Sequence, residues 1–145
     1  MRCLIVDDSA HFVAAARSML EREGVAVVGA ASTGTDALRC FEQLRPDVTL
    51  VDLDLGDESG FDVAEQLHRA AGSAGSVVIL VSTHTAQDFA DLIEASPAAG
   101  FVAKYALSGG VIRDLVGRRD HQLAEMREGG YPNHTSVIVP GLEQR

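Results

Sequence analysis

Short continuous runs of apolar residues alternate along the chain with longer segments in which apolar residues recur at helical spacing. A continuous run is typical of a strand that is covered on both faces, whereas a half-exposed strand alternates apolar and polar residues. Five strands are predicted in this way, at Cys3 to Val6, Val25 to Gly29, Val48 to Val51, Val77 to Val81 and Gly100 to Ala103. A segment of helical period follows each of them, so the pattern predicts five strands and five helices.

The strict order of strand and then helix indicates an α/β protein, with a parallel sheet and helices on both of its faces. Capping signals support the boundaries, since Ser9 and Ser108 are suitable N-caps and Gly24 is a suitable helix end. Right-handed crossovers make this a doubly wound five-stranded parallel sheet. Sheets of this kind bind ligands at the carboxyl ends of their strands, so functional residues are expected there.

The composition narrows the functional classes. The chain has 145 residues, 46% of them hydrophobic, which fits one compact domain. Its apolar runs are shorter than the roughly 18 residues that a membrane span needs, and no secretory signal is visible, so a cytoplasmic protein is expected. The formal net charge of −9 opposes direct binding to nucleic acid or to an anionic membrane surface. Cys3 and Cys40 lack the spacing of a disulfide framework or a metal site.

Polar side chains follow four of the five predicted strands. Asp7 and Asp8 follow the first strand, Asp52 the third, Ser82 the fourth and Lys104 the fifth. Three carboxylates at one sheet edge repel one another by several kcal/mol, so they require a cation or must bind protons. Carboxylates without His or Cys favour a hard ion such as Mg²⁺. The alternative that the acidic pair and the Ser after it form an ordinary helix-capping turn stays open.

Lys104 is the only lysine in the sequence, and it directly follows a predicted strand. Its ammonium group, the Ser82 hydroxyl and a metal-bound carboxylate would together stabilise a phosphoryl group on Asp52, because each neutralises or donates to a phosphoryl oxygen. Asp52 would then act as a nucleophile that forms an acyl phosphate.

This set of residues resembles the receiver domain of two-component response regulators. The resemblance covers about residues 2 to 117 and depends on separated positions that agree in order and type. They are the acidic pair Asp7-Asp8, Asp52 in Leu50-Val51-Asp52-Leu53, Ser82 in Val81-Ser82-Thr83, Phe101, and Lys104. The resemblance implies a flavodoxin-like, chemotaxis-type receiver fold with strand order 2-1-3-4-5.

The resemblance also implies the chemistry of the site. Asp52 accepts a phosphoryl group from a histidine kinase or a phosphotransfer protein, and Lys104 assists. Asp8 and Asp52 ligate Mg²⁺ directly, Asp7 acts mainly through water, and Asp54 offers its backbone carbonyl. The protein is then a signalling switch and not an enzyme, because its chemistry is limited to its own phosphorylation and dephosphorylation.

The output of the switch follows from the same resemblance. Ser82 and Phe101 form the switch pair: the hydroxyl moves toward the phosphoryl group and the aromatic ring turns inward behind it. The output surface then lies at about residues 85 to 116, and homodimerisation through this helix-strand-helix face is expected on phosphorylation. The change is a population shift between two packings.

The segment after Lys104 departs from the usual family pattern. Tyr105 follows Lys104 where Pro is usual, and a trans peptide bond is expected there because a cis bond without Pro costs about 3 kcal/mol. The segment Lys104-Tyr105-Ala106-Leu107-Ser108 resembles receivers of the LuxR-type class, which end in a DNA-binding domain. Residues 118 to 145 are too short for that domain. We therefore expect a receiver at 1 to 117, then a helix extension and flexible tail, in a stand-alone or an excised receiver.

Three other functions fit parts of the pattern. Asp52-Leu53-Asp54 is similar to the nucleophile and acid pair of haloacid dehalogenase-type phosphatases, but Gly56 stands where that family usually has Thr. A flavin-binding flavodoxin shares the architecture, but Asp7 and Asp8 would repel its phosphate. An atypical receiver that is not phosphorylated and acts as a constitutive binding module keeps the shape without the chemistry.

Overall fold

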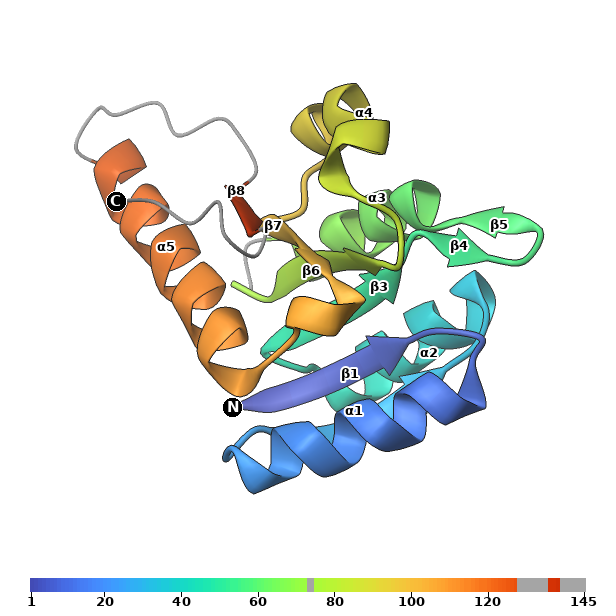
Figure 1. The fold of residues 1–145 in the computed structure, drawn as a ribbon. Coiled ribbons are helices and arrows are strands. Elements are labelled where there is room, and N and C mark those ends of the chain that lie inside the picture. Colours follow the sequence, from blue (N-terminus) through green and yellow to red (C-terminus); the bar gives the residue numbers. More distant parts are fainter. Residues whose placement is uncertain (73–74, 128–135, 139–145) are drawn as a thin grey trace.

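A parallel sheet forms the centre of the computed structural model (Figure 1). The structure describes residues 1–72, 75–127 and 136–138. Of these, residues 119–127 and 136–138 are described by their backbone alone. The strands of the sheet lie in the order β2-β1-β3-β6-β7-β8. They are β1 (Arg2–Val6), β2 (Ala26–Ala31), β3 (Val48–Asp52), β6 (Val77–Ser82), β7 (Gly100–Ala103) and β8 (Ser136–Ile138). The α-helices are α1 (Ala10–Arg22), α2 (Gly34–Leu44), α3 (Gly60–Ala71), α4 (Ala90–Ala95) and α5 (Gly109–Arg127).

The predicted doubly wound fold and its strand order are confirmed. The five predicted strands correspond to β1, β2, β3, β6 and β7, and all their pairings are parallel. Because β1 pairs with both β2 and β3, the strand order reverses beside β1. This reversal is the switch point at which a doubly wound sheet opens a crevice at the carboxyl ends of its strands.

Alternate residues of each strand supply two hydrophobic cores, one on each face of the sheet. In β1, Leu4 and Val6 pack in the core beneath α2, α3 and α4, whereas Cys3 and Ile5 pack in the core beneath α1 and α5. All four are fully buried. This double burial explains why the strands read as continuous apolar runs. Burial also raises the pKa of the Cys3 thiol to about 12, so the thiol stays neutral at physiological pH.

Several short elements were not predicted. A two-stranded antiparallel hairpin, β4 (Asp54–Leu55) and β5 (Glu58–Ser59), follows β3. A short 3₁₀ helix, Ala86–Phe89, precedes α4, which itself has only 6 residues. Each element is too short for a hydrophobic period to develop, so the sequence pattern could not distinguish it from a loop.

A further unpredicted element is β8, which pairs in parallel with β7 and aligns Phe101 with Val137. These three residues belong to the segment for which the sequence predicts a flexible tail, and the structure describes them as a strand. β7 would otherwise present unpaired backbone groups at the sheet edge, and residues such as Val and Ile favour extended pairing. The rest of the expected tail, residues 128–135 and 139–145, lies outside the described residues.

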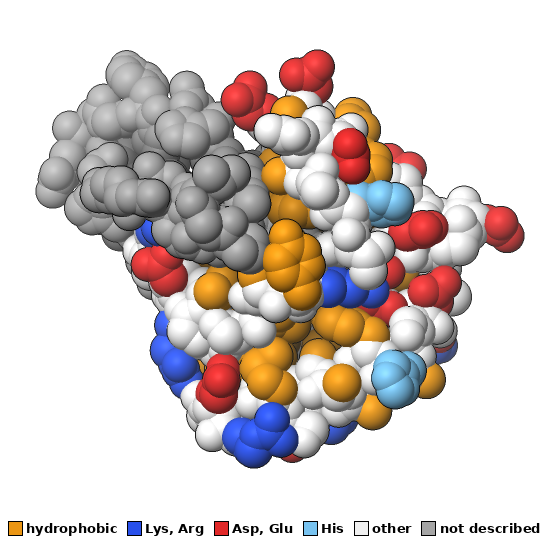
Figure 2. Space-filling model, in the orientation of Figure 1, with side chains coloured by type: hydrophobic (Ala, Val, Ile, Leu, Met, Phe, Trp, Pro, Cys, Tyr) orange, Lys and Arg blue, Asp and Glu red, His pale blue; other side chains and the backbone are white. Residues whose placement is uncertain are grey.

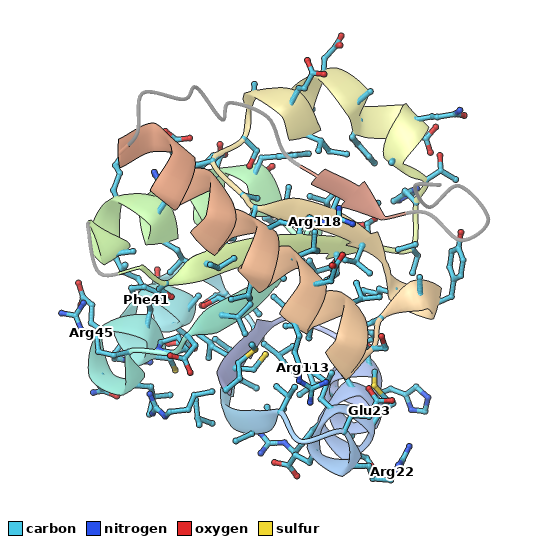
Figure 3. The ribbon with its side chains drawn as sticks, turned by 90° about the vertical axis from the view of Figure 1, so that its left-hand side faces the viewer. Arg22, Glu23, Phe41, Arg45, Arg113 and Arg118 are labelled. Carbon is cyan, nitrogen blue, oxygen red and sulfur yellow. The ribbon has the colours of Figure 1, made fainter. Side chains whose placement is uncertain are left out.

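Polar contacts join the end of α1 to the start of α5. The Glu23 side chain accepts a hydrogen bond from the Gly109 N–H at the start of α5, and the Arg113 guanidinium donates to the Glu23 carbonyl. Figure 3 shows Glu23 and Arg113 side by side at this junction. A carboxylate at a helix N-terminus satisfies a free N–H and interacts favourably with the helix dipole. Within the described part of the chain, no helix combines the length and apolar character that crossing a membrane requires.

We expect Thr49→Val to stabilise the fold. Thr49 is fully buried in β3, and among the described residues its hydroxyl has no hydrogen-bond partner. Replacing a buried unpaired hydroxyl by a methyl group of similar shape should raise the free energy of unfolding by about 1 kcal/mol, measured by urea denaturation.

Thr33→Val is the matched control, because the Thr33 hydroxyl accepts the Asp36 N–H at 3.1 Å and caps α2. This variant should lower the free energy of unfolding by about 1 kcal/mol. Destabilisation by both variants would show that Thr49 has a polar partner.

Candidate functional site

Three carboxylates meet at the carboxyl ends of the two paired strands β1 and β3. Asp7 and Asp8 directly follow β1, and Asp52 is the last residue of β3. One oxygen from each lies within 4.8 Å of the other two. Asp7 and Asp52 are buried, whereas Asp8 is exposed. Figure 2 shows acidic side chains gathered on this side of the molecule. The sequence expectation that these residues meet at one edge of the sheet agrees with their placement.

The Lys104 ammonium lies between two of the carboxylates. Its Nζ is 2.7 Å from Asp7 Oδ2 and 3.4 Å from Asp52 Oδ2. Lys104 directly follows β7 and opens the 3₁₀ turn Lys104–Ala106, and its side chain is only 14% exposed. All peptide bonds among the described residues are trans, including the one to Tyr105, as expected. The ammonium thus offsets part of the repulsion between Asp7 and Asp52.

Backbone turns fix the orientation of both buried carboxylates. Asp7 Oδ1 accepts the Ser9 N–H at 2.8 Å, and the Ser9 hydroxyl in turn accepts the Phe12 N–H at 3.2 Å as the N-cap of α1. The predicted Ser9 cap and the acidic cluster are therefore parts of one arrangement, not alternatives. Asp52 Oδ1 accepts the Asp54 N–H at 3.3 Å. Each carboxylate has one oxygen held by a backbone N–H and the other turned toward Lys104.

Burial and charge shift two ionisation equilibria in the site. Burial raises the pKa of Asp52, and the Asp7 charge raises it further, while the Asp54 N–H and Lys104 act in the opposite direction. Burial alone would lower the pKa of Lys104, but its hydrogen bond to Asp7 and the two carboxylate charges outweigh this effect and raise it. Lys104 therefore stays an ammonium ion, and Asp52 is a less acidic and more basic carboxyl group than usual.

Gly60 lets α3 begin directly against the backbone of Asp52. A side chain at this position would place its Cβ 2.1 Å from the Asp52 carbonyl oxygen. The Gly60 N–H donates to the Leu53 carbonyl at 2.9 Å, which fastens the start of α3 to the end of β3. Any larger residue would displace the segment that carries Asp52.

The remaining predicted residues lie around this cluster. Ser82 ends β6, the neighbour of β3, and is 1% exposed; its hydroxyl accepts the His84 N–H at 3.0 Å. Phe101 is fully buried in the core beneath α3 and α4, so its ring already has an inward position. Asp54 is exposed in β4 and contacts Asp52 through its backbone. Among the residues that the structure describes, the Ser82 side chain makes no hydrogen bond to Asp52.

Two residues near the site were not singled out by the sequence analysis. Glu58 of β5 accepts the Gly34 N–H at 2.7 Å, which ties the hairpin after Asp52 to the start of α2. The Phe12 ring lies against Lys104, with Nζ 4.3 Å from the ring centroid. The sequence places Phe12 in a helical apolar stripe, a pattern that does not distinguish a core residue from one that faces a cation.

The chain belongs to the response regulator receiver domain family, whose model matches residues 3–112. This confirms the resemblance drawn from the sequence and supports a phosphorylation-based signalling switch. The phosphatase and flavodoxin interpretations do not account for this match.

Individual relatives agree with this assignment. The chain is 36% identical over 107 residues to a protein-glutamate methylesterase/protein-glutamine glutaminase 2 from Koribacter versatilis, covering 72% of this chain and 29% of that protein. It is 28% identical over 104 residues to the DNA-binding transcriptional activator EvgA of Escherichia coli, covering 72% and 50%. A CheY-like receiver domain protein from Methanospirillum hungatei superposes with a TM-score of 0.63 at 26% identity, covering 89% and 98%. The chain thus spans half or less of the two curated relatives.

We expect Asp52→Asn to stabilise the protein at neutral pH. Because the pKa of Asp52 is raised on folding, this carboxyl group contributes stability below its unfolded-state pKa and loses that contribution as pH rises through the folded-state pKa. The free energy of unfolding of the variant should therefore be higher than that of the unsubstituted protein by on the order of 1 kcal/mol near pH 7. This difference should shrink as the pH falls. Urea denaturation at neutral and acidic pH measures it.

Asp57→Asn is the control for the change in net charge, because Asp57 is exposed. It should leave the stability near neutral pH almost unchanged. An Asp52→Asn variant that is less stable than the unsubstituted protein at neutral pH would contradict the raised pKa.

Proposed function

We propose that this protein is a phosphorylation-dependent signalling switch in which Asp52 accepts a phosphoryl group. The observation that carries the proposal is the contact of Lys104 with Asp52 and Asp7 at the carboxyl ends of three strands. Family membership supports the reaction class, and this contact supports the choice of residues. A histidine kinase or a phosphotransfer protein is the proposed donor.

The proposed chemistry is a nucleophilic displacement at phosphorus. An Asp52 carboxylate oxygen forms a bond to phosphorus while the bond to the donor's leaving group breaks, and the product is an acyl phosphate on Asp52. The raised pKa of Asp52 supports this role, because a more basic carboxylate is a better nucleophile once it is deprotonated. Lys104 would balance charge on the phosphoryl oxygens, since its raised pKa keeps it protonated.

The donor set fits a magnesium ion. The oxygens of Asp7, Asp8 and Asp52 lie within 4.8 Å of one another, and this group contains no His or Cys that would favour a softer metal. Asp8 and Asp52 are the proposed direct ligands, with Asp7 acting through water and the Asp54 backbone carbonyl as a further ligand. When bound, the ion supplies positive charge that neutralises phosphoryl oxygens.

Ser82 and Phe101 are the proposed switch pair. Ser82 lies at the end of the strand beside Asp52, and its O–H remains available as a donor because its hydroxyl accepts the hydrogen bond from the His84 N–H. Phe101 is buried inward in this structure, so the switch requires a second packing in which the ring lies outward. Phosphorylation would then favour the inward packing by a population shift.

The buried, inward position of the Phe101 ring also supports a second candidate function, a constitutive binding module. A receiver that already holds Phe101 in the core and Lys104 against Asp52 could present its output face without phosphorylation. The two functions differ in one property, the formation of the acyl phosphate.

We propose that the output face consists of residues 85 to 116 and forms a homodimer on phosphorylation. Leu92 on α4 and Tyr105 after β7 are 53% and 72% exposed, which leaves two large apolar side chains on this range. Because β8 occupies the free edge of β7, dimer contacts would come from side chains and not from strand pairing.

A receiver of this type works in the cytoplasm, and the free thiols of Cys3 and Cys40 fit a reducing compartment.

Incubation with a small acyl phosphate and Mg²⁺ should add the mass of one phosphoryl group to the intact protein. Asp52→Asn should abolish this gain, because the amide is not a nucleophile, and intact-protein mass spectrometry measures it. Asp57→Asn, at an exposed position in the turn between β4 and β5, should still gain the mass. An unsubstituted protein that stays unmodified would favour the constitutive module.

A phosphoryl mimic such as beryllofluoride should shift the protein from monomer to dimer in sedimentation velocity. Leu92→Ser should weaken the dimer about tenfold, since it removes the burial of one large apolar side chain. Ala15→Ser, at an exposed position on α1, is the control and should dimerise normally. A protein that stays monomeric with the mimic would remove homodimerisation from the proposal.

A further inference from the structure

The aromatic ring of Phe12 covers one side of the Lys104 ammonium. Nζ lies 4.3 Å from the ring centroid, within the range of a cation–π interaction. The contact joins α1 to the turn after β7, two segments that are far apart in the sequence. Neither the sequence motifs nor the proposed function assigns a role to Phe12.

The start of α1 fixes the position of this ring. The Phe12 N–H donates to the capping hydroxyl of Ser9, and the Ser9 N–H donates to Asp7 Oδ1. The same turn therefore orients both groups that contact Lys104 from this side, the Asp7 carboxylate and the Phe12 ring. Phe12 is half-buried against the core beneath α1 and α5, which limits the freedom of the ring.

A neutral aromatic ring can attract the Lys104 ammonium without adding negative charge to the site, which a third carboxylate cannot do. Lys104 lies nearer to Asp7, at 2.7 Å, than to Asp52, at 3.4 Å. Another acidic group beside it would attract the ammonium further from Asp52 and would repel an incoming phosphoryl group. The ring attracts the cation through its quadrupole and adds no net charge.

We propose that Phe12 is a positioning residue, whose ring holds the Lys104 ammonium within reach of a phosphoryl group on Asp52. This inference depends on the proposed function. The ring does not touch the reacting atoms; it acts through Lys104. The consequence is that the rate of acyl phosphate formation depends on the electron density of the ring, and not only on its size.

The rate test uses site-specific replacement of Phe12 by phenylalanines that carry one, two or three ring fluorines. Fluorine withdraws electron density from the ring face while it changes the shape little. The rate of Asp52 phosphorylation by a small acyl phosphate should fall with each added fluorine. The variant with three ring fluorines should react about five-fold more slowly than the unsubstituted protein. The same series at Phe41, which is buried in the core beneath α2, is the matched control and should leave the rate unchanged.

A second measurement does not require phosphorylation. Because Lys104 is the only lysine in the chain, isotope-labelled lysine gives one side-chain ε-methylene signal in NMR. A ring face beside this group shifts its proton resonance upfield, and Phe12→Leu should return the resonance toward the value of free lysine.

The outcomes separate the two proposals. A graded loss of rate at Phe12 alone, together with the NMR shift, supports the inference. Equal rates along the Phe12 series, or equal losses at Phe41, would overturn it. An unsubstituted protein that forms no acyl phosphate contradicts the proposed function; in that case an ε-methylene signal that is unaffected by Phe12→Leu overturns the contact as well.

Discussion

The ion pairs of Lys104 with Asp7 and Asp52 are the interaction on which the site depends. Two buried carboxylates at the ends of adjacent strands would repel each other strongly, and burial adds to the cost of ionising them. Lys104 offsets this cost from a third strand end, so the three side chains can remain charged and close together. The raised pKa of Asp52 shows that the compensation is incomplete. A site that still carries excess negative character is suited to receive a further cation.

The parallel sheet makes this concentration of charge possible. All its paired strands end at the same edge, so residues separated by about fifty positions in sequence lie beside one another without any local motif. Short local contacts then fix the side chains: the Ser9 cap orients Asp7, and Gly60 brings the start of α3 against the Asp52 backbone. The hydrophobic cores on both faces support these ends, which places the polar chemistry on a rigid scaffold.

The sequence predicted the large elements because each one leaves a periodic signal. Strands that are buried on two faces give continuous apolar runs in the sequence. Because the predicted sheet is parallel, the carboxyl ends of these strands could be expected to carry the functional residues. The hairpin after Asp52 and the 3₁₀ turn before α4 left no such signal, since two to four residues cannot establish a period. β8 was missed for another reason. Its pairing depends on a free sheet edge that only the assembled fold supplies.

The same distinction applies to the site. Asp7, Asp52 and Lys104 could be predicted because charged residues that end apolar strands are conspicuous. Phe12 could not, because an aromatic residue in a helical stripe has the same pattern whether it faces the core or a cation, and only the packing of α1 beside the turn after β7 decides between them. Phe12 does both, since one part of its surface packs on the core while its ring face meets the ammonium. A residue that links core packing to the position of Lys104 also gives α1 a physical connection to the carboxylate cluster.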